Sequence, residues 1–448
     1  MNKSPQKIIY KIEHQTIVQI SLALFSGILL ALGFPLAKGI TLSPIAWFCL
    51  VPFLLAIKNA SAKRAFLLGL LTGIVGNLGI FYWIPYCMIT YAGMPKAIAY
   101  LALFLMVLVL AGYFAIFGWI LRLCQSNLKI SSLIIGPILW VSLEYIRTYF
   151  PLGGFAWALL GSSQYKFLSA IQVSELAGVW IVSWLVAFVN FGITSLFQKW
   201  PPSKKSWLEF SLPLLFLLAS IGYGAIRIRA VDRAFAQQPE IKVAIIQGNI
   251  DQGVKWSPFY FWSSISRHIA LSQSLLKEPK DLLIWPEAAI TTYFNVSWEN
   301  KSQSDVVKEI SVFDTYFLFG SISEGFQDGK KIVFNSAYLL SPYAENLLGR
   351  YDKIHLVPFG EYVPMQKILF WVDAIAGGNT GNTNPGKKVT VFDTGKFKIA
   401  CVICYELIFP NLVRKFTKAG AQIMSTVTND AWFGSTSAPY QHNSNIIF

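Results

Sequence analysis

The chain has 448 residues, of which 54% are hydrophobic and only 13% are charged, and this composition excludes an ordinary soluble protein of that size. The formal net charge of +14 would suit a nucleic-acid-binding protein, but the basic residues lie in short clusters between apolar stretches and not along one stripe or arm. We therefore expect a membrane protein whose anionic partners are lipid headgroups and not nucleic acid.

Seven apolar segments occupy the N-terminal half of the chain, and each is close to the roughly 20 residues that a helix needs to span a bilayer. Charged residues fall mostly between these segments. They predict a multi-pass α-helical membrane domain over residues 1–233 with about seven transmembrane helices. The segments are Ile17–Leu36, Ile40–Ile57, Ala65–Ile84, Ala97–Leu121, Ile130–Ile146, Leu168–Phe197 and Trp207–Ile226.

The basic residues that flank these segments predict the orientation of the chain, because Lys and Arg near the ends of spans are retained in the cytoplasm. With the N-terminus inside, the inner connections carry eleven Lys and Arg residues and the outer connections carry four. Seven crossings then place the residues after Ile226 outside, in the periplasm of a bacterium with two membranes. A cleaved signal peptide is the alternative for the first segment, since Ala31-Leu-Gly33 is a small-x-small pattern, but the apolar run is long and further spans follow.

Three ionisable residues, Glu144, Arg147 and Glu175, lie in or beside the apolar segments. Ionised side chains are expensive in lipid, so these residues mark either a functional site or pairs that pack helices together. The sequence leaves both interpretations open.

Polar residues return after Arg233, and short β-rich runs then alternate with helical ones. This change in composition and periodicity predicts a separate α/β domain over residues 234–448. Its expected strands are Ile241–Gln247, Asp281–Trp285 and Gln422–Thr428, its expected helices are Phe259–Leu276 and Asn411–Ala419, and Val389–Asp393 is expected to form a hairpin with Lys396–Tyr405.

The five cysteines form no even framework, and Cys49, Cys87 and Cys124 lie in apolar stretches where a small hydrophobic side chain is the ordinary explanation. Cys401 and Cys404 have the CxxC spacing of some redox and metal sites, but no second pair accompanies them. On the predicted strand they point to opposite faces about 10 Å apart, too far for a disulfide. We expect neither a disulfide nor a metal site.

Three polar residues, Glu287, Lys353 and Cys404, stand at predicted strand ends, where protein scaffolds usually present chemistry. A catalytic thiol needs a base that takes its proton, and a cation that stabilises the thiolate and the oxyanion formed after attack on a carbonyl. Glu, Lys and Cys supply these roles. Each residue alone also has an ordinary explanation, as a carboxylate at a helix N-terminus, a surface lysine and a core thiol.

The segments around these three residues resemble known signatures. Trp285-Pro-Glu287, Tyr351-Asp-Lys353 and Cys404-Tyr-Glu406 are similar to those of the nitrilase, or carbon-nitrogen hydrolase, superfamily, whose catalytic residues are Glu, Lys and Cys in that order. Longer strings resemble the apolipoprotein N-acyltransferase family, the membrane branch of that superfamily. These strings are Gln247–Trp256, His355–Pro364 and Asn429–Gly434, with Leu143–Arg147 and Gly154–Trp157 in the membrane half, where Ala156 replaces an expected proline.

The resemblance implies a four-layer αββα sandwich and a two-step reaction that requires no metal or organic cofactor. Cys404 would take an acyl chain from a membrane phospholipid as a thioester, and the free amino group of an apolipoprotein diacylglyceryl-cysteine would then accept it as an amide. Glu287 would act as the general base and Lys353 as the stabilising cation. The supporting or substrate-binding residues would be Glu361, Trp256, Tyr405 and Glu406.

The same resemblance implies a location in the bacterial inner membrane, with the catalytic domain in the periplasm. The family usually continues through further sandwich strands and an eighth span, whereas this sequence stops at Phe448, soon after Gln441-His-Asn443. We therefore expect a domain shortened at its C-terminus, and hence less stable or less active, because missing strands leave apolar faces and sheet edges uncovered.

Some interpretations remain open from the sequence. Phe370, Trp371 and Trp432 could enter the membrane interface or pack in the core, and Gly377–Gly386 is either a gate over the site or a surface loop. A membrane-tethered amidase, in which water replaces the amine, would use the same catalytic residues. A transporter with a ligand-binding outer domain is the alternative from another class, although the seven segments contain no visible repeat.

Overall fold

The structure is a computed structural model of the chain, and it describes residues 5–128, 130–198, 200–365 and 383–448. The chain divides into two compact units. The first, here called the helical unit, consists of Met1–Tyr86, Pro95–Gln237 and Ser435–Phe448, and the second, the α/β unit, consists of Cys87–Met94 and Gln238–Gly434. The main division at Gln237 lies close to the boundary predicted after residue 233, but residues 87–94 and 435–448 each group with the other half of the sequence.

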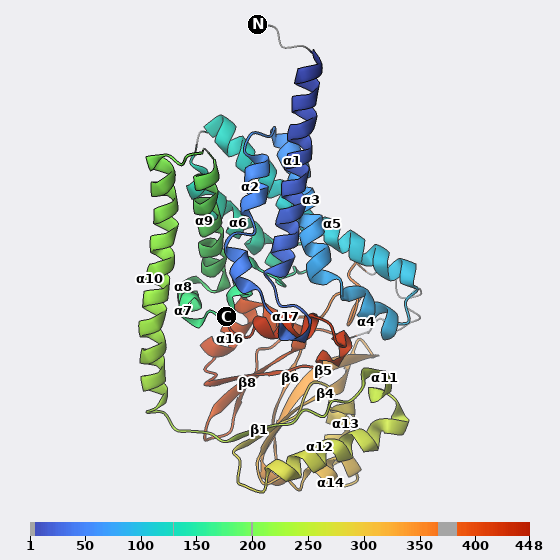
Figure 1. Cartoon of the computed structure of the whole chain (residues 1–448). Helices are drawn as coiled ribbons and strands as arrows, with labels where there is room; N and C mark the ends of the chain where they lie inside the picture. Colours follow the sequence, from blue (N-terminus) through green and yellow to red (C-terminus); the bar gives the residue numbers. More distant parts are fainter. Residues whose placement is uncertain (1–4, 129, 199, 366–382) are drawn as a thin grey trace. The chain divides into compact units, whose positions relative to one another are not determined.

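The helical unit is a bundle in which five of the described helices are long and apolar enough to cross a membrane (Figure 1). Long apolar helices suit a bilayer because their backbone polar groups are all satisfied within the helix. These five are α1 (Pro5–Leu32), α3 (Ala62–Phe81), α5 (Lys96–Leu123), α9 (Val179–Phe197) and α10 (Lys204–Phe235).

The remaining predicted segments are shorter or interrupted. The second is broken into η2 (Ser43–Trp47) and α2 (Val51–Ile57), and the fifth is the 18-residue α6 (Ser132–Tyr149). The sixth begins with two short helices and becomes the long α9 only after Gly178, whose φ of 65° turns the chain. The number of membrane crossings stays a prediction. The other short helices are η1 (Ala37–Gly39), α4 (Ile84–Thr90), η3 (Cys124–Leu128), η4 (Leu160–Gln164), α7 (Leu168–Ile171), α8 (Ser174–Ala177) and α17 (Ala438–Ser444).

Buried Asn190 on α9 explains how the break between η2 and α2 is tolerated. Its Oδ1 accepts a hydrogen bond from the Leu50 backbone N–H at 2.8 Å, and its Nδ2 donates to the carbonyl oxygen of Ala46 at 2.9 Å. An irregular backbone inside a helical bundle needs such partners, because unsatisfied peptide groups are costly away from water. A side chain far along the sequence therefore permits the second segment to be interrupted.

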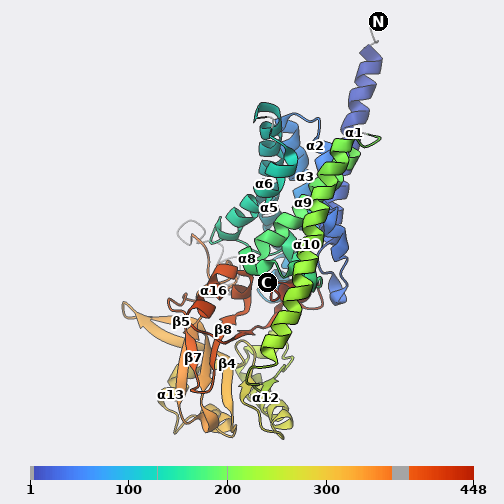
Figure 2. The same ribbon diagram turned by 90° about the vertical axis from the view of Figure 1, so that its left-hand side faces the viewer.

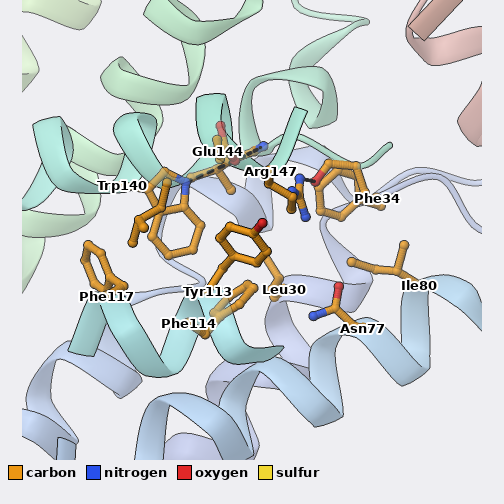
Figure 3. A pocket seen from close by; sticks show the side chains of 13 residues that line it. Leu30, Phe34, Asn77, Ile80, Tyr113, Phe114, Phe117, Trp140, Glu144 and Arg147 are labelled. Atoms are coloured by element: carbon orange, nitrogen blue, oxygen red, sulfur yellow. Dashed lines mark hydrogen bonds between the residues drawn. The ribbon is translucent and has the colours of Figure 1, made fainter. Parts of the chain in front are cut away.

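Glu144 and Arg147 on α6 line a cavity of about 30 Å³ with mostly aromatic and aliphatic walls (Figure 3). Glu144 Oε1 accepts a hydrogen bond from the Leu160 backbone N–H at 2.7 Å, and Arg147 Nη2 donates to the carbonyl oxygen of Trp157 at 3.2 Å. Glu175 forms an ion pair of 2.7 Å with an arginine on α10. All three ionisable residues thus have structural partners that attach one helix to another segment.

The last residues of the sequence pack within the helical unit. Gln441 on α17 is buried, and its Oε1 accepts hydrogen bonds from the indole nitrogens of Trp83 and Trp157 at 3.2 Å and 3.1 Å. Its Nε2 donates to two main-chain oxygens of the bundle. The ring of His442 stacks on that of Trp157, with centroids 5.3 Å apart. This short helix is therefore held by several specific contacts.

The α/β unit contains two β-sheets (Figure 2). The larger sheet has the order β1-β2-β4-β5-β6, with β3 paired to β4, and the smaller has the order β7-β8-β9. Their strands are β1 (Val243–Ile245), β2 (Leu282–Ile284), β3 (Ile290–Tyr293), β4 (Tyr316–Gln327), β5 (Lys330–Leu340), β6 (Leu347–Asp352), β7 (Val391–Asp393), β8 (Lys398–Ile403) and β9 (Ile423–Val427). The helices are α11 (Gln252–Lys255), η5 (Pro258–Tyr260), α12 (Phe261–Leu275), α13 (Phe294–Glu299), α14 (Asp305–Ile310), η6 (Pro342–Ala344), η7 (Cys404–Ile408), α16 (Pro410–Lys418) and η8 (Asp430–Phe433).

The larger sheet is buried on both faces, which gives this unit its layers. Phe317 and Tyr338 belong to the core formed with α12, α13 and α14. Alternate residues of a strand face opposite sides, and Leu318 on the other face is buried as well. On that face Tyr316 donates a hydrogen bond to the carbonyl oxygen of Thr394, in the turn between β7 and β8, at 2.8 Å. The α/β fold predicted from the sequence, with two sheets and covering helices, is confirmed.

The smaller sheet differs from the prediction in one detail that matters for the site. Its strand β8 ends at Ile403, whereas the predicted strand continued to Tyr405. Phe370, Trp371 and residues 377–382 of the glycine-rich stretch lie outside the described residues. The described end of that stretch is attached to the larger sheet, since the Asn384 N–H donates to the carbonyl oxygen of Val333 in β5 at 2.7 Å.

Candidate active site

Glu287, Lys353 and Glu361 form a group of charged side chains, of which the first two are buried and stand at strand ends. Glu287 follows β2 and Lys353 follows β6. Lys353 Nζ lies 2.8 Å from Glu361 Oε2 and 3.7 Å from Glu287 Oε1, and only 1% of Lys353 is exposed. Burial by itself favours the neutral amine, but Glu361 and Glu287 outweigh it and raise the pKa of Lys353 well above its usual value. This lysine is therefore held as a cation.

The two carboxylates are oriented by shared amide donors. Asn335 Nδ2 donates to Glu287 Oε1 at 2.8 Å and to Glu361 Oε1 at 2.9 Å. The backbone N–H of Asn429 donates to Glu287 Oε2 at 3.0 Å, and the backbone N–H of Val357 donates to Glu361 Oε2 at 2.8 Å. Each carboxylate thus has a defined orientation toward Lys353.

Cys404 is the first residue of η7, directly after β8, and its φ of 51° is rare for a residue with a side chain. Such strain persists only where the surroundings hold it, and it is common at active sites. Burial and the charge of Glu287 raise the pKa of the Cys404 thiol, while Lys353 lowers it. The resting thiol is therefore protonated and needs a base before it can act as a nucleophile.

Cys401 differs from Cys404 in its surroundings. It lies within β8, paired with Ser425 of β9, and it is fully buried. Its thiol donates to the carbonyl oxygen of Val402 at 3.4 Å, and burial raises its pKa. The two thiols are thus separated by the end of a strand, and not only by the alternation of faces along one.

Glu406 is a buried carboxyl group that binds the segments on which Lys353 and Cys404 lie. It is fully buried and accepts hydrogen bonds from Tyr351 Oη at 2.7 Å and from the backbone N–H groups of Ile354 and Ile403 at 2.7 Å and 2.8 Å. These donors come from the segments that carry Lys353 and Cys404. Glu406 thereby links the two segments. Tyr405 is also buried, and it packs near His355 and Phe409.

Trp256 lies outside this buried group, since 48% of it is exposed. The neighbouring Lys255 is only 6% exposed, and its Nζ donates to the main-chain oxygen of Glu287 at 2.8 Å. Sequence reasoning missed Lys255 and Asn335. Lys255 lies in a string that carried the family resemblance, so its position beside Trp256 was the available signal; Asn335 lies within β5 and no motif marks it.

Within the described ranges, no group of three or more His, Cys, Asp or Glu side chains is placed to hold a metal ion. The side chains that meet in this arrangement supply a thiol, three carboxyl groups and two amines.

Comparison with known families gives two matches that together span most of the chain. The model of the apolipoprotein N-acyltransferase N-terminal domain matches residues 26–192, and the carbon-nitrogen hydrolase model matches residues 242–445. An apolipoprotein N-acyltransferase from Geobacter metallireducens is 40% identical over 432 residues, which cover 95% of this chain and 80% of the relative. One from Vibrio cholerae is 31% identical over 432 residues, which cover 94% and 80%.

Two solved structures show distant similarity to part of this chain. A member of branch 10 of the nitrilase superfamily from Saccharomyces cerevisiae is 20% identical, with a TM-score of 0.30, and covers 42% of this chain and 64% of its own. A carbon-nitrogen hydrolase from Helicobacter pylori is 16% identical, with the same TM-score of 0.30, and covers 42% and 59%.

Proposed function

This chain belongs to the apolipoprotein N-acyltransferase family, and from that premise we propose that Cys404 carries the acyl group as a thioester between two half-reactions. The protein is an acyltransferase of lipoprotein maturation, and the family membership decides against the amidase and the transporter. The observation that carries the proposal is the buried contact of Lys353 with two carboxylates, close to a strained Cys404.

In the first half-reaction, we assign the acyl donor to a membrane phospholipid. Glu287 takes the proton of the Cys404 thiol, and the thiolate attacks the ester carbonyl. The Lys353 ammonium stabilises first the thiolate and then the oxyanion. The ester C–O bond breaks as the C–S bond remains, and the leaving alkoxide takes the proton from Glu287. The products are a lysophospholipid and an acyl thioester on Cys404.

In the second half-reaction, the acceptor is the free α-amino group of a diacylglyceryl-cysteine apolipoprotein. The amine attacks the thioester carbonyl and passes a proton to Glu287. The C–S bond breaks, an amide forms, and the Cys404 thiolate recovers its proton from Glu287. Glu361 supports both steps because its ion pair keeps Lys353 charged. Glu406 and Tyr405 hold the segment on either side of the nucleophile, and Trp256, which is partly exposed, is a candidate contact for substrate.

We place this activity in the bacterial inner membrane with the α/β unit in the periplasm. The support is the excess of basic residues in the inner connections, eleven against four, and the apolar helices of the first unit. Reporter fusions after Lys205 and after Arg233 are expected on opposite sides of the membrane. If both fusions report the cytoplasm, the proposed orientation is wrong. The proposal that the α/β unit acts on exported lipoproteins then fails as well.

The proposal is tested by mass spectrometry of the intact chain in lipid nanodiscs that contain phospholipid but no lipoprotein. The wild type should gain one acyl mass that hydroxylamine removes, because thioesters are cleaved by that nucleophile. Cys401→Ala should retain the adduct, and Cys404→Ala should lose both the adduct and transfer. An adduct that survives Cys404→Ala, or a folded wild type that never acquires one, overturns the covalent mechanism.

A further inference from the structure

Lys255 has no part in the reaction described so far, yet its amine lies inside the buried group around Glu287. Lys255 is at the end of α11, and its Nζ donates to the main-chain oxygen of Glu287 at 2.8 Å. Glu287 and Cys404 both lie close enough to favour its charged form. Lysine is almost never buried without a partner, because an ammonium loses much of its solvation away from water. The burial of Lys255 therefore indicates that its ammonium interacts with negatively charged groups beside it.

Helix α11 holds Glu287 at two points. Lys255 binds the main-chain oxygen, and Gln252, one turn earlier on the same face, acts on the carboxylate through Asn429. The Asn429 side chain donates to Gln252 Oε1 at 2.6 Å, and the Asn429 backbone N–H donates to Glu287 Oε2 at 3.0 Å. Gln252 and Lys255 are both buried. Helix α11, which lies outside the predicted catalytic motifs, thus fixes both the main chain and the carboxylate of Glu287.

The charges around Cys404 show why a second cation is needed. Three carboxyl groups, Glu287, Glu361 and Glu406, lie in this region, and each accepts hydrogen bonds. Lys353 is one cation among these groups, and a second cation beside Glu287 offsets more of their negative charge before a thiolate forms. Lys255 supplies that second cation, and its charge favours the Cys404 thiolate electrostatically. The other titratable groups near these residues are Asp430, His268, Tyr351, His355 and Tyr405.

We propose that Lys255 is a second cation of the acylation centre, which positions Glu287 and stabilises the Cys404 thiolate. The inference rests on the proposed role of Cys404. Burial lowers the pKa of Lys255 to about 8, although Glu287 and Cys404 oppose the change. The ammonium is therefore present below pH 8, and its support of the thiolate is lost as the pH rises through 8. Both neighbouring histidines have lowered pKa values, so they are neutral in this range.

The test measures alkylation of Cys404 by iodoacetamide between pH 6.5 and 9.5, on the full chain in nanodiscs, by peptide mass spectrometry. Lys255→Met removes the hydrogen bond and the charge, Lys255→Gln keeps a donor without charge, and Lys255→Arg keeps the charge. Lys277→Met, an exposed lysine of the same unit, is the control. Thermal unfolding verifies that each variant is folded.

At pH 7 Lys255→Met and Lys255→Gln should both slow alkylation about tenfold or more, the effect of one pKa unit on the thiol. The ratio of wild-type to variant rates should fall toward one as the pH passes 8, and Lys255→Arg should keep the wild-type advantage at higher pH. A ratio that is constant with pH, a Gln variant equal to the wild type, or a Met variant within about twofold of it would overturn the proposal. If the Met variant unfolds, the wild-type, Gln and Arg profiles decide the same question.

Formation of the acyl adduct, followed in parallel, separates this inference from the proposed function. A wild type that is alkylated with the expected dependence on Lys255, but that forms no adduct, refutes the acyl-transfer proposal and leaves the cation in place. A wild type that forms the adduct at the same rate as the Lys255 variants refutes only the inference about Lys255.

Discussion

Both units of the protein bury polar side chains, but they do so with different partners. In the helical unit Asn190, Glu144 and Gln441 bind main-chain groups or indole nitrogens, and these contacts hold irregular segments in place. In the α/β unit the amine of Lys353 is buried against two carboxylates, those of Glu361 and Glu287. Burial alone therefore does not mark a catalytic group. A buried charge with ionisable neighbours can exchange protons with them, whereas a buried polar group that has only main-chain or indole partners stabilises the fold.

The largest expected effect comes from changing the charge group at its centre. Lys353→Arg keeps the charge, but the planar guanidinium is too broad for a site that is 1% exposed and lies 2.8 Å from Glu361. We expect acyl-adduct formation to fall by about a hundredfold or more, as for the loss of an oxyanion donor. Single-turnover kinetics with labelled phospholipid measure it. Near-normal turnover would reduce Lys353 to a general electrostatic aid.

A smaller loss is expected when the supporting carboxylate is neutralised. Glu361→Gln removes the ion pair that keeps the pKa of Lys353 raised, so a smaller fraction of the lysine is charged when the thiolate forms. We expect adduct formation to slow about tenfold, the equivalent of one pKa unit. Glu345→Gln, an exposed glutamate, is the matched control. Equal rates for both variants would show that Lys353 does not depend on Glu361.

The helical unit should respond in stability instead of chemistry. Gln441→Ala leaves the indole donors of Trp83 and Trp157 without their acceptor, at an expected cost of about 2 kcal/mol. Thermal unfolding in detergent measures the cost, and Gln237→Ala, an exposed glutamine, is the control. The alkylation rate of Cys404 in the folded protein should be unchanged. A variant as stable as the control would mean that the hydrogen bonds of Gln441 do not hold α17 in place.

The smallest effect is expected at the second thiol. Cys401→Ala removes a buried sulfur from β8, so we expect a stability loss of about 1 kcal/mol, with the acyl adduct retained. Comparison of adduct formation with unfolding temperature separates the two readouts. If a folded Cys401→Ala protein loses the adduct, Cys404 is not sufficient for acylation and the assignment of the thioester to Cys404 alone is wrong.

The sequence was sufficient to predict those site residues that lie in recognisable motifs. Glu287, Lys353 and Cys404 were predicted at strand ends because alternation and turn residues reveal where short strands stop. The structure brings together Glu287, Lys353 and Glu361, which the family resemblance had put forward. Their catalytic roles stay predictions until variants are measured. The membrane character and the family were likewise present in composition and in contiguous strings.

Only the tertiary structure decided which residues surround that group. Lys255, Asn335 and Asn429 reach Glu287 from positions 32, 48 and 142 residues away in the sequence, so no local pattern relates them to it. The same holds for the place of the chain end, where Gln441 finds partners more than 280 residues earlier. Periodicity reports which face of an element is apolar, and motifs report which residues lie side by side. The partners of a buried polar atom are set by how distant elements pack, because its hydrogen bonds must be satisfied by whatever the fold places beside it.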